Sequence, residues 1–186
     1  MIGHMDRRGM LDFKYTMVEF GAGKAELSHM VCVATRQKNA TLSPAVVPIK
    51  NPHFVLIDRD TFRRKADNLI RIEFHGKKQQ LLQHRVDIEP MEMDTVKRIM
   101  IDIKDLNWSK MHSVIPSQCV VIGKHLCGIA TDMTLRCITT SSMTPPPPPL
   151  VSPHVQAIFI ALCCHQLCTL DSYISMCIIY IMCKQQ

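Results

Sequence analysis

Two glycines follow a short apolar segment near the N-terminus and stand beside an acidic residue. Residues 16–20 are mostly apolar but include Glu19, and Gly21 and Gly23 come directly after them. Residues 24–34 then carry apolar side chains at helical spacing. A strand, a glycine turn and a helix in this order let the backbone approach a ligand closely, with the free N–H groups of the helix pointing at it. A structural turn without a ligand is the alternative.

The acids around this turn indicate which ligand it would hold. Glu19 precedes the glycines, and Asp58 ends the next apolar segment, residues 54–57. Two carboxylates would repel a pyrophosphate, but they can bond an amino group and ribose hydroxyls. S-adenosylmethionine has both groups and no phosphate, so the pattern favours it over a dinucleotide. Asp102 or Asp105 could reach the adenine or be a loop acid, and Asp58 could instead cap the following helix.

A second group of chemically useful side chains follows another buried segment, residues 119–122. Lys124 and His125 stand there between Gly123 and Gly128. Ligands of open α/β sheets bind outside the carboxyl ends of the strands, so this group is expected at the same edge as the first turn. His125 could take a proton or orient a substrate, and Lys124 could bind a phosphate. A structural histidine beside a buried cysteine is the alternative.

Cysteines and a histidine gather around the end of the last apolar segment, which covers residues 157–163. They are Cys163, Cys164, His165 and Cys168. These side chains could bind zinc, or one of the thiols could be a nucleophile. Adjacent cysteines point to opposite sides of an extended strand, however, and no second Cys-x-x-Cys pair completes a tetrahedral set. We therefore predict no metal site.

These motifs need a framework of alternating strands and helices. Strands are expected over residues 16–20, 54–57, 99–103, 119–122 and 157–163, and helices over residues 24–34, 61–70 and 130–138. Residues 35–53 are predicted to be a loop, and residues 139–153, which contain consecutive prolines, a stiff surface linker. The alternation predicts an α/β fold with a mostly parallel sheet covered on both faces.

Length and composition exclude several classes of protein. The chain has 186 residues, 47% of them hydrophobic, which suffices for one domain with a substantial core. Its net charge of +6 is compatible with a phosphate-rich partner. No apolar segment approaches the ~20 residues of a membrane helix, and the first residues lack the apolar part of a secretion signal. The nine cysteines have no disulfide-like spacing, so the chain is expected to be reduced and intracellular.

Three blocks of the sequence resemble the family of tRNA 2′-O-methyltransferases that modify nucleotide 4 of the acceptor stem. The blocks are residues 18–24 with 26–29, residues 123–128 with 130–137, and residues 162–165. The resemblance covers residues 15–173 as a methyltransferase domain, with 1–14 as an N-terminal tail and 174–186 as a divergent C-terminal tail. It implies a Rossmann-like methyltransferase fold, S-adenosylmethionine as the cofactor and tRNA as the partner.

The resemblance also implies roles for individual residues. It places Glu19, Gly21 and Gly23 against the cofactor, and Asp58 matches the acidic end of the family's second strand. The blocks around His125 and His165 would line the acceptor side. Either histidine is thus a candidate to take the proton of the 2′-hydroxyl. Lys124 is better suited to a phosphate of the acceptor stem.

The sequence departs from the family pattern at several points. Ala25 stands where a third glycine is usual, and Gln166 where a second histidine is usual. The family's N-terminal cysteine/histidine zinc module is expected to be absent from this chain. A methyltransferase sheet normally has seven strands, so the sheet predicted here is incomplete. The alternative function is a truncated, catalytically inactive relative that binds RNA or a partner without methylating.

Overall fold

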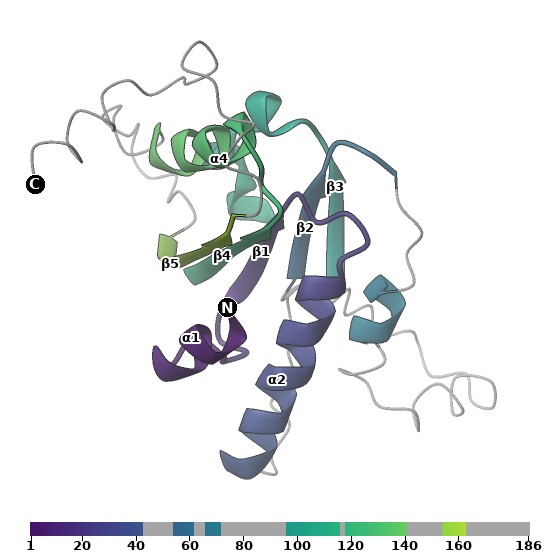
Figure 1. Cartoon of the computed structure of the whole chain (residues 1–186), viewed down its shortest axis with the longest axis vertical. Helices are drawn as coiled ribbons and strands as arrows, with labels where there is room; N and C mark the ends of the chain where they lie inside the picture. The colour runs from purple at the N-terminus through teal and green to yellow at the C-terminus, as the bar shows by residue number, and fades with distance from the viewer. Residues whose placement is uncertain (43–53, 62–65, 72–95, 116–117, 141–153, 163–186) are drawn as a thin grey trace, which may run out of the picture.

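The computed structural model (Figure 1) describes residues 1–42, 54–61, 66–71, 96–115, 118–140 and 154–162. Its centre is a sheet of strands β1 (Thr16–Phe20), β2 (Phe54–Asp58), β3 (Val96–Met100), β4 (Gln118–Lys124) and β5 (His154–Ala161). The strand order is β3-β2-β1-β4-β5, and every neighbouring pair is parallel. The predicted α/β fold with a parallel, Rossmann-like sheet is confirmed.

Helices lie on both sides of this sheet. Helices α1 (Ile2–Arg7) and α2 (Glu26–Leu42) lie on one side in Figure 1, and α4 (Ile129–Thr140) lies on the other. Two 3₁₀ helices, η1 (Ile103–Asp105) and η2 (Trp108–Ser113), follow β3, and residues 66–71 form a further helical segment. Among the described residues, no helix has the length and apolar character needed to cross a membrane.

Burial on both faces explains why the central strands are largely apolar. In β2, Phe54 and Leu56 belong to the core that includes residues of α1 and α2, whereas Val55 and Ile57 belong to the core that includes η2 and α4. All four side chains are buried. A strand with a core on each face has no polar face, so its sequence does not alternate.

Several predicted elements have different bounds in the structure, and three of them differ by more than two residues at one end. The helix predicted over 24–34 begins at Glu26 and ends at Leu42. Residues 35–42, predicted to belong to a loop, are thus helical, because the prolines on which the loop prediction rests, Pro44, Pro48 and Pro52, all come after them in the sequence. The strand predicted over 99–103 is β3, three residues earlier, and the strand predicted over 157–163 is β5, which ends at Ala161.

The structure describes the predicted N-terminal tail but not the predicted C-terminal tail. Before residue 15, Met5 of α1 and Leu11 are buried in the same core as Met17 of β1, so this segment contributes to packing. Most of the predicted linker, and the residues predicted as a C-terminal tail, lie outside the described part of the chain. The prediction that the sheet lacks its closing strands depends on residues outside the described part of the chain, so it stays a prediction.

Candidate functional site

The two glycine motifs meet at the carboxyl edge of the sheet. Strands β1 and β4 are neighbours, with Phe20 opposite Gly123, so the turns that follow them start side by side. The strand order also reverses here, because β2 and β3 lie on one side of β1 whereas β4 and β5 lie on the other. In open α/β sheets, such a reversal point is where ligands bind. The sequence-based expectation that both motifs share one edge is confirmed.

The turn between β1 and α2 has a left-handed backbone at three positions. Gly21 has φ of 64°, Gly23 of 50° and Ala25 of 61°. A Cβ atom built on Gly21 would lie 2.9 Å from Cδ2 of Leu126, whereas one built on Gly23 would meet nothing within 4 Å. The left-handed φ therefore favours glycine at position 21, where a side chain would also crowd Leu126, and Gly23 leaves open space beside the backbone. Alanine in this conformation costs roughly 1–2 kcal/mol, and a glycine at position 25 would avoid that cost.

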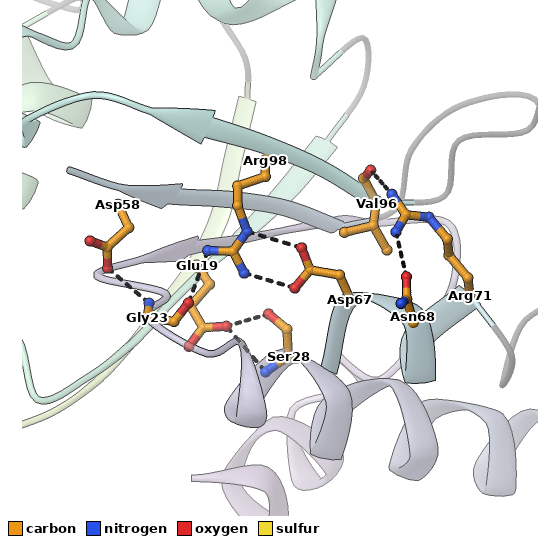
Figure 2. Close-up of polar contacts among 9 residues, drawn as sticks. All are labelled: Glu19, Gly23, Ser28, Asp58, Asp67, Asn68, Arg71, Val96 and Arg98. Atoms are coloured by element: carbon orange, nitrogen blue, oxygen red, sulfur yellow. Dashed lines mark hydrogen bonds and ion pairs between the residues drawn. The ribbon is translucent and has the colours of Figure 1, made fainter. Parts of the chain in front are cut away.

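Asp58 holds this turn from the end of β2. Its Oδ2 atom accepts the backbone N–H of Gly23 at 2.8 Å (Figure 2), and its Oδ1 atom accepts the N–H of Asp60 at 3.0 Å. An ionised carboxylate can accept about four hydrogen bonds, so these two leave capacity for a ligand. The geometry is compatible with both sequence-based interpretations, a loop cap and a ribose ligand.

Glu19 is buried behind the turn, with 3% of its surface exposed. Its Oε2 atom accepts the backbone N–H of Ser28 at 3.1 Å and also the Ser28 hydroxyl (Figure 2). Burial raises the pKa of Glu19 to about 7, although the hydrogen bonds from Ser28 and the charge of Arg98 act in the opposite direction. Glu19 thus ties β1 to the first turn of α2, and its contact with a cofactor stays a prediction.

Sequence reasoning missed Arg98 and Asp67, which also support the turn. Arg98 Nε lies 2.9 Å from Asp67 Oδ2 and Nη2 lies 2.7 Å from Asp67 Oδ1, with the two side chains 6% and 2% exposed. Arg98 Nη1 donates to the carbonyl oxygen of Gly23 at 2.9 Å. The arginine and the aspartate are 31 residues apart in sequence, and no local pattern predicts that they pair.

The turn between β4 and α4 presents its polar side chains to solvent. Lys124 and His125 are exposed, and His125 has a left-handed φ of 64°. The N–H of His125 donates to the carbonyl of Ala161 at 3.2 Å, and its own carbonyl accepts the N–H of Cys127 at 2.9 Å. A non-glycine residue held in this conformation by its surroundings is typical of functional sites.

Leu126, which sequence reasoning also missed, joins the two turns. Its side chain is 2% exposed and lies against Gly21 and Gly123, and a Cβ atom at Gly123 would overlap it. Gly123 has no left-handed φ, so its role is to leave room for this leucine. Gly123, near the end of β4, is a local signal that another side chain uses this space, but it does not indicate which one.

Asp102 follows β3 at the same edge of the sheet. Its side chain caps η1 by accepting the N–H of Lys104 at 3.1 Å, and the residue is partly exposed. Asp105, the other acid predicted to be near the adenine, is exposed within η1. Nothing in these contacts distinguishes an adenine ligand from a loop acid, so Asp102 stays a predicted cofactor residue.

His165 and the neighbouring Cys163, Cys164 and Cys168 lie outside the described residues. Within the described ranges, no three histidine, cysteine or acidic side chains gather as a metal site would require. Burial raises the pKa of Cys119 to about 12 and that of Cys137 to about 11. Neither thiol is suited to nucleophilic chemistry, because the thiolate is the reactive form.

Comparison with known proteins identifies relatives that match most of the chain. The tRNA:m(4)X modification enzyme TRM13 of Saccharomyces cerevisiae is 36% identical over 177 residues, which cover 93% of this chain and 35% of that protein. The enzyme of the same name from Vanderwaltozyma polyspora is 35% identical over 179 residues, covering 94% and 36%. A TRM13 homologue from Mus musculus is 32% identical over 140 residues, covering 74% and 23%.

The chain spans roughly a third of the length of the two yeast relatives. No solved structure matches it significantly. The profile of the family described as methyltransferase TRM13 matches residues 1–185, which include both glycine turns and all five described strands. This 186-residue chain therefore belongs to the methyltransferase TRM13 family.

Proposed function

We propose that this chain carries the S-adenosylmethionine-binding core of an enzyme that methylates the ribose 2′-hydroxyl of nucleotide 4 in the acceptor stem of certain tRNAs, inside the cell. The observation that carries the proposal is the left-handed glycine turn at the reversal point of the sheet, with open space beside Gly23. The name of the yeast relatives, tRNA:m(4)X modification enzyme, supports tRNA as the substrate.

The residues around this turn fit the chemistry of that cofactor. Gly21 and Gly23 allow the backbone to approach it, Asp58 has lone pairs left for ribose hydroxyls, and Asp102 lies at the edge where the adenine would be bound. Glu19 supplies a carboxylate close behind the turn and holds α2 in place. When bound, S-adenosylmethionine supplies a methyl group activated by its sulfonium.

The turn after β4 is proposed to face the acceptor nucleotide. His125 is exposed and would take the proton of the 2′-hydroxyl as a neutral imidazole, a contribution of ~10²–10⁴ to the rate, while alignment with the sulfonium supplies more. Lys124, also exposed, would bind a phosphate of the acceptor stem. His165 is the alternative base.

A non-enzymatic relative that binds RNA or a partner without methylating is the second candidate. The two functions differ in one measurable respect. Only the enzyme transfers a methyl group to tRNA.

Binding of S-adenosylhomocysteine, measured by titration calorimetry, tests the cofactor site. We expect Gly23→Asp to lower the affinity at least about a hundredfold, because an anion would occupy the open space beside the turn. Gly9→Asp is the matched control, since Gly9 has a left-handed φ of 68° and open surroundings too, but lies in the turn after α1. Equal affinities for the two variants would place the site elsewhere.

Transfer of tritiated methyl groups to tRNA tests the acceptor side. His125→Ala should bind S-adenosylhomocysteine as the wild type does and lose about 10²–10⁴ in transfer rate. A wild-type rate for His125→Ala together with a loss for His165→Ala would reverse the two roles. If the wild-type chain binds the cofactor but transfers no methyl group, the non-enzymatic candidate is favoured.

A further inference from the structure

The peptide groups on both sides of Gly23 are held by charged side chains from two different strands. Asp58 at the end of β2 accepts the Gly23 N–H at 2.8 Å, and Arg98 of β3 donates to the Gly23 carbonyl at 2.9 Å. Figure 2 shows the two side chains approaching the turn from the sheet. Glycine has more backbone freedom than any other residue. These two hydrogen bonds therefore limit the conformations of the most flexible position in the turn.

Arg98 is itself fixed in one orientation. Two of its nitrogens bond the two carboxylate oxygens of Asp67 at 2.9 and 2.7 Å, and the third bonds Gly23. The guanidinium is planar, so a bidentate carboxylate on one edge sets the direction of the remaining donor. Asp67 thus influences Gly23 through Arg98, because these hydrogen bonds join Asp67 to the arginine and only the arginine to the turn.

We propose that Arg98, oriented by Asp67, is a positioning residue for the cofactor, because it sets the conformation of the Gly23 turn before the cofactor binds. The inference rests on the proposed function, since it concerns the same site. A turn that is already ordered loses less conformational entropy on binding, and the affinity is correspondingly higher. Neither Arg98 nor Asp67 needs to contact the cofactor for this effect.

Arg71 provides a matched control within the same pair of elements. It lies in the helical segment that also contains Asp67, and its Nη2 atom donates to the carbonyl of Val96, the first residue of β3, at 3.2 Å. Figure 2 shows Arg71 at the end of the segment away from Gly23. Both arginines tie this helical segment to β3, but the contact with Gly23 belongs to Arg98.

The test compares Arg98→Met/Asp67→Leu with Arg71→Met in the full chain. Replacing both members of the buried pair with apolar residues avoids an uncompensated charge, so the double variant should fold. We expect its affinity for S-adenosylhomocysteine to fall about tenfold or more, the equivalent of one hydrogen bond to a charged group. Exchange of the Gly23 amide hydrogen in the free protein should accelerate, and Arg71→Met should change neither property, even if its melting temperature falls.

Asp67→Asn keeps the side-chain volume and one of the two acceptors that orient Arg98, although it should lower stability because it leaves the buried arginine charge without compensation. It should lose affinity in the same direction and by less than the double variant. Wild-type affinity in the folded double variant, or an equal loss in Arg71→Met, would overturn the inference while leaving the proposed function intact. If the wild-type chain does not bind S-adenosylhomocysteine, the proposed function fails and this inference fails with it.

Discussion

Compared with the turn after β4, the turn after β1 is surrounded by charged side chains that are buried or partly buried. Asp58 and Arg98 bond the two sides of Gly23, and buried Glu19 bonds the start of α2. The turn after β4 instead rests on the apolar side chain of Leu126, and its own charged side chains are exposed. The two turns lie side by side on one sheet, yet different forces hold them.

This difference bears on how each turn responds to change. Removing one partner from a buried charged pair leaves the other without compensation, which costs several kcal/mol. Exposed side chains such as Lys124 can be replaced with little effect on stability. We therefore expect the loss of a buried charged group on the proposed cofactor side to lower stability, whereas replacing the exposed side chains on the proposed acceptor side should leave stability nearly unchanged.

The largest expected effect concerns the apolar contact. Leu126→Ala should lower the free energy of unfolding by about 2–5 kcal/mol, because it opens a cavity between Gly21 and Gly123. Chemical denaturation measures the loss. Lys124→Ala, two residues away and exposed, is the control and should stay within about 0.5 kcal/mol of wild type. A loss below about 1 kcal/mol for Leu126→Ala would show that the leucine does not hold the two turns together.

A smaller effect should appear as a pH dependence of stability. Burial raises the pKa of Glu19 to about 7 from its ordinary value of 4.5, so the folded state binds the proton more tightly than the unfolded state. The resulting contribution to stability is fully present below pH 4.5, and it is lost as the pH rises toward and past 7. Its full size is about 3 kcal/mol at most.

Glu19→Gln isolates this contribution, because the amide oxygen can still accept from Ser28 but does not titrate. Denaturation midpoints at pH 4.5, 6 and 8 should fall more steeply for the wild type than for the variant. The nearby charges, Arg98 and Asp58, are present in both proteins, so their contributions largely cancel in the comparison. Parallel pH profiles would mean that Glu19 keeps an ordinary pKa and that the turn after β1 is not proton-sensitive.

The smallest effect concerns the left-handed backbone at His125. His125→Gly should be more stable than His125→Ala by up to about 1 kcal/mol, because glycine adopts a φ of 64° without strain. Both variants remove the imidazole and should transfer methyl groups equally poorly. Thermal melts compare the two. Equal melting temperatures would indicate that no backbone strain is stored at this position.

The sequence alone determined the parts of the site that depend on local signals. Strands β1, β2 and β4 are largely apolar because both of their faces are buried, and glycines that follow β1 and end β4 mark the turns. Because parallel strands end at one edge, the sequence also predicted that Gly23, Asp58 and His125 lie along that edge.

Only the tertiary structure decided which side chains hold these turns in place. Strand β3 was predicted three residues late because Lys97 and Arg98 do not look like residues of a buried strand. Arg98 is tolerated there because Asp67, distant in sequence, neutralises its charge. Leu126 likewise fills a space that exists only when β1 and β4 are paired. Contacts of this kind depend on segments far apart in sequence, so no local pattern of residues encodes them.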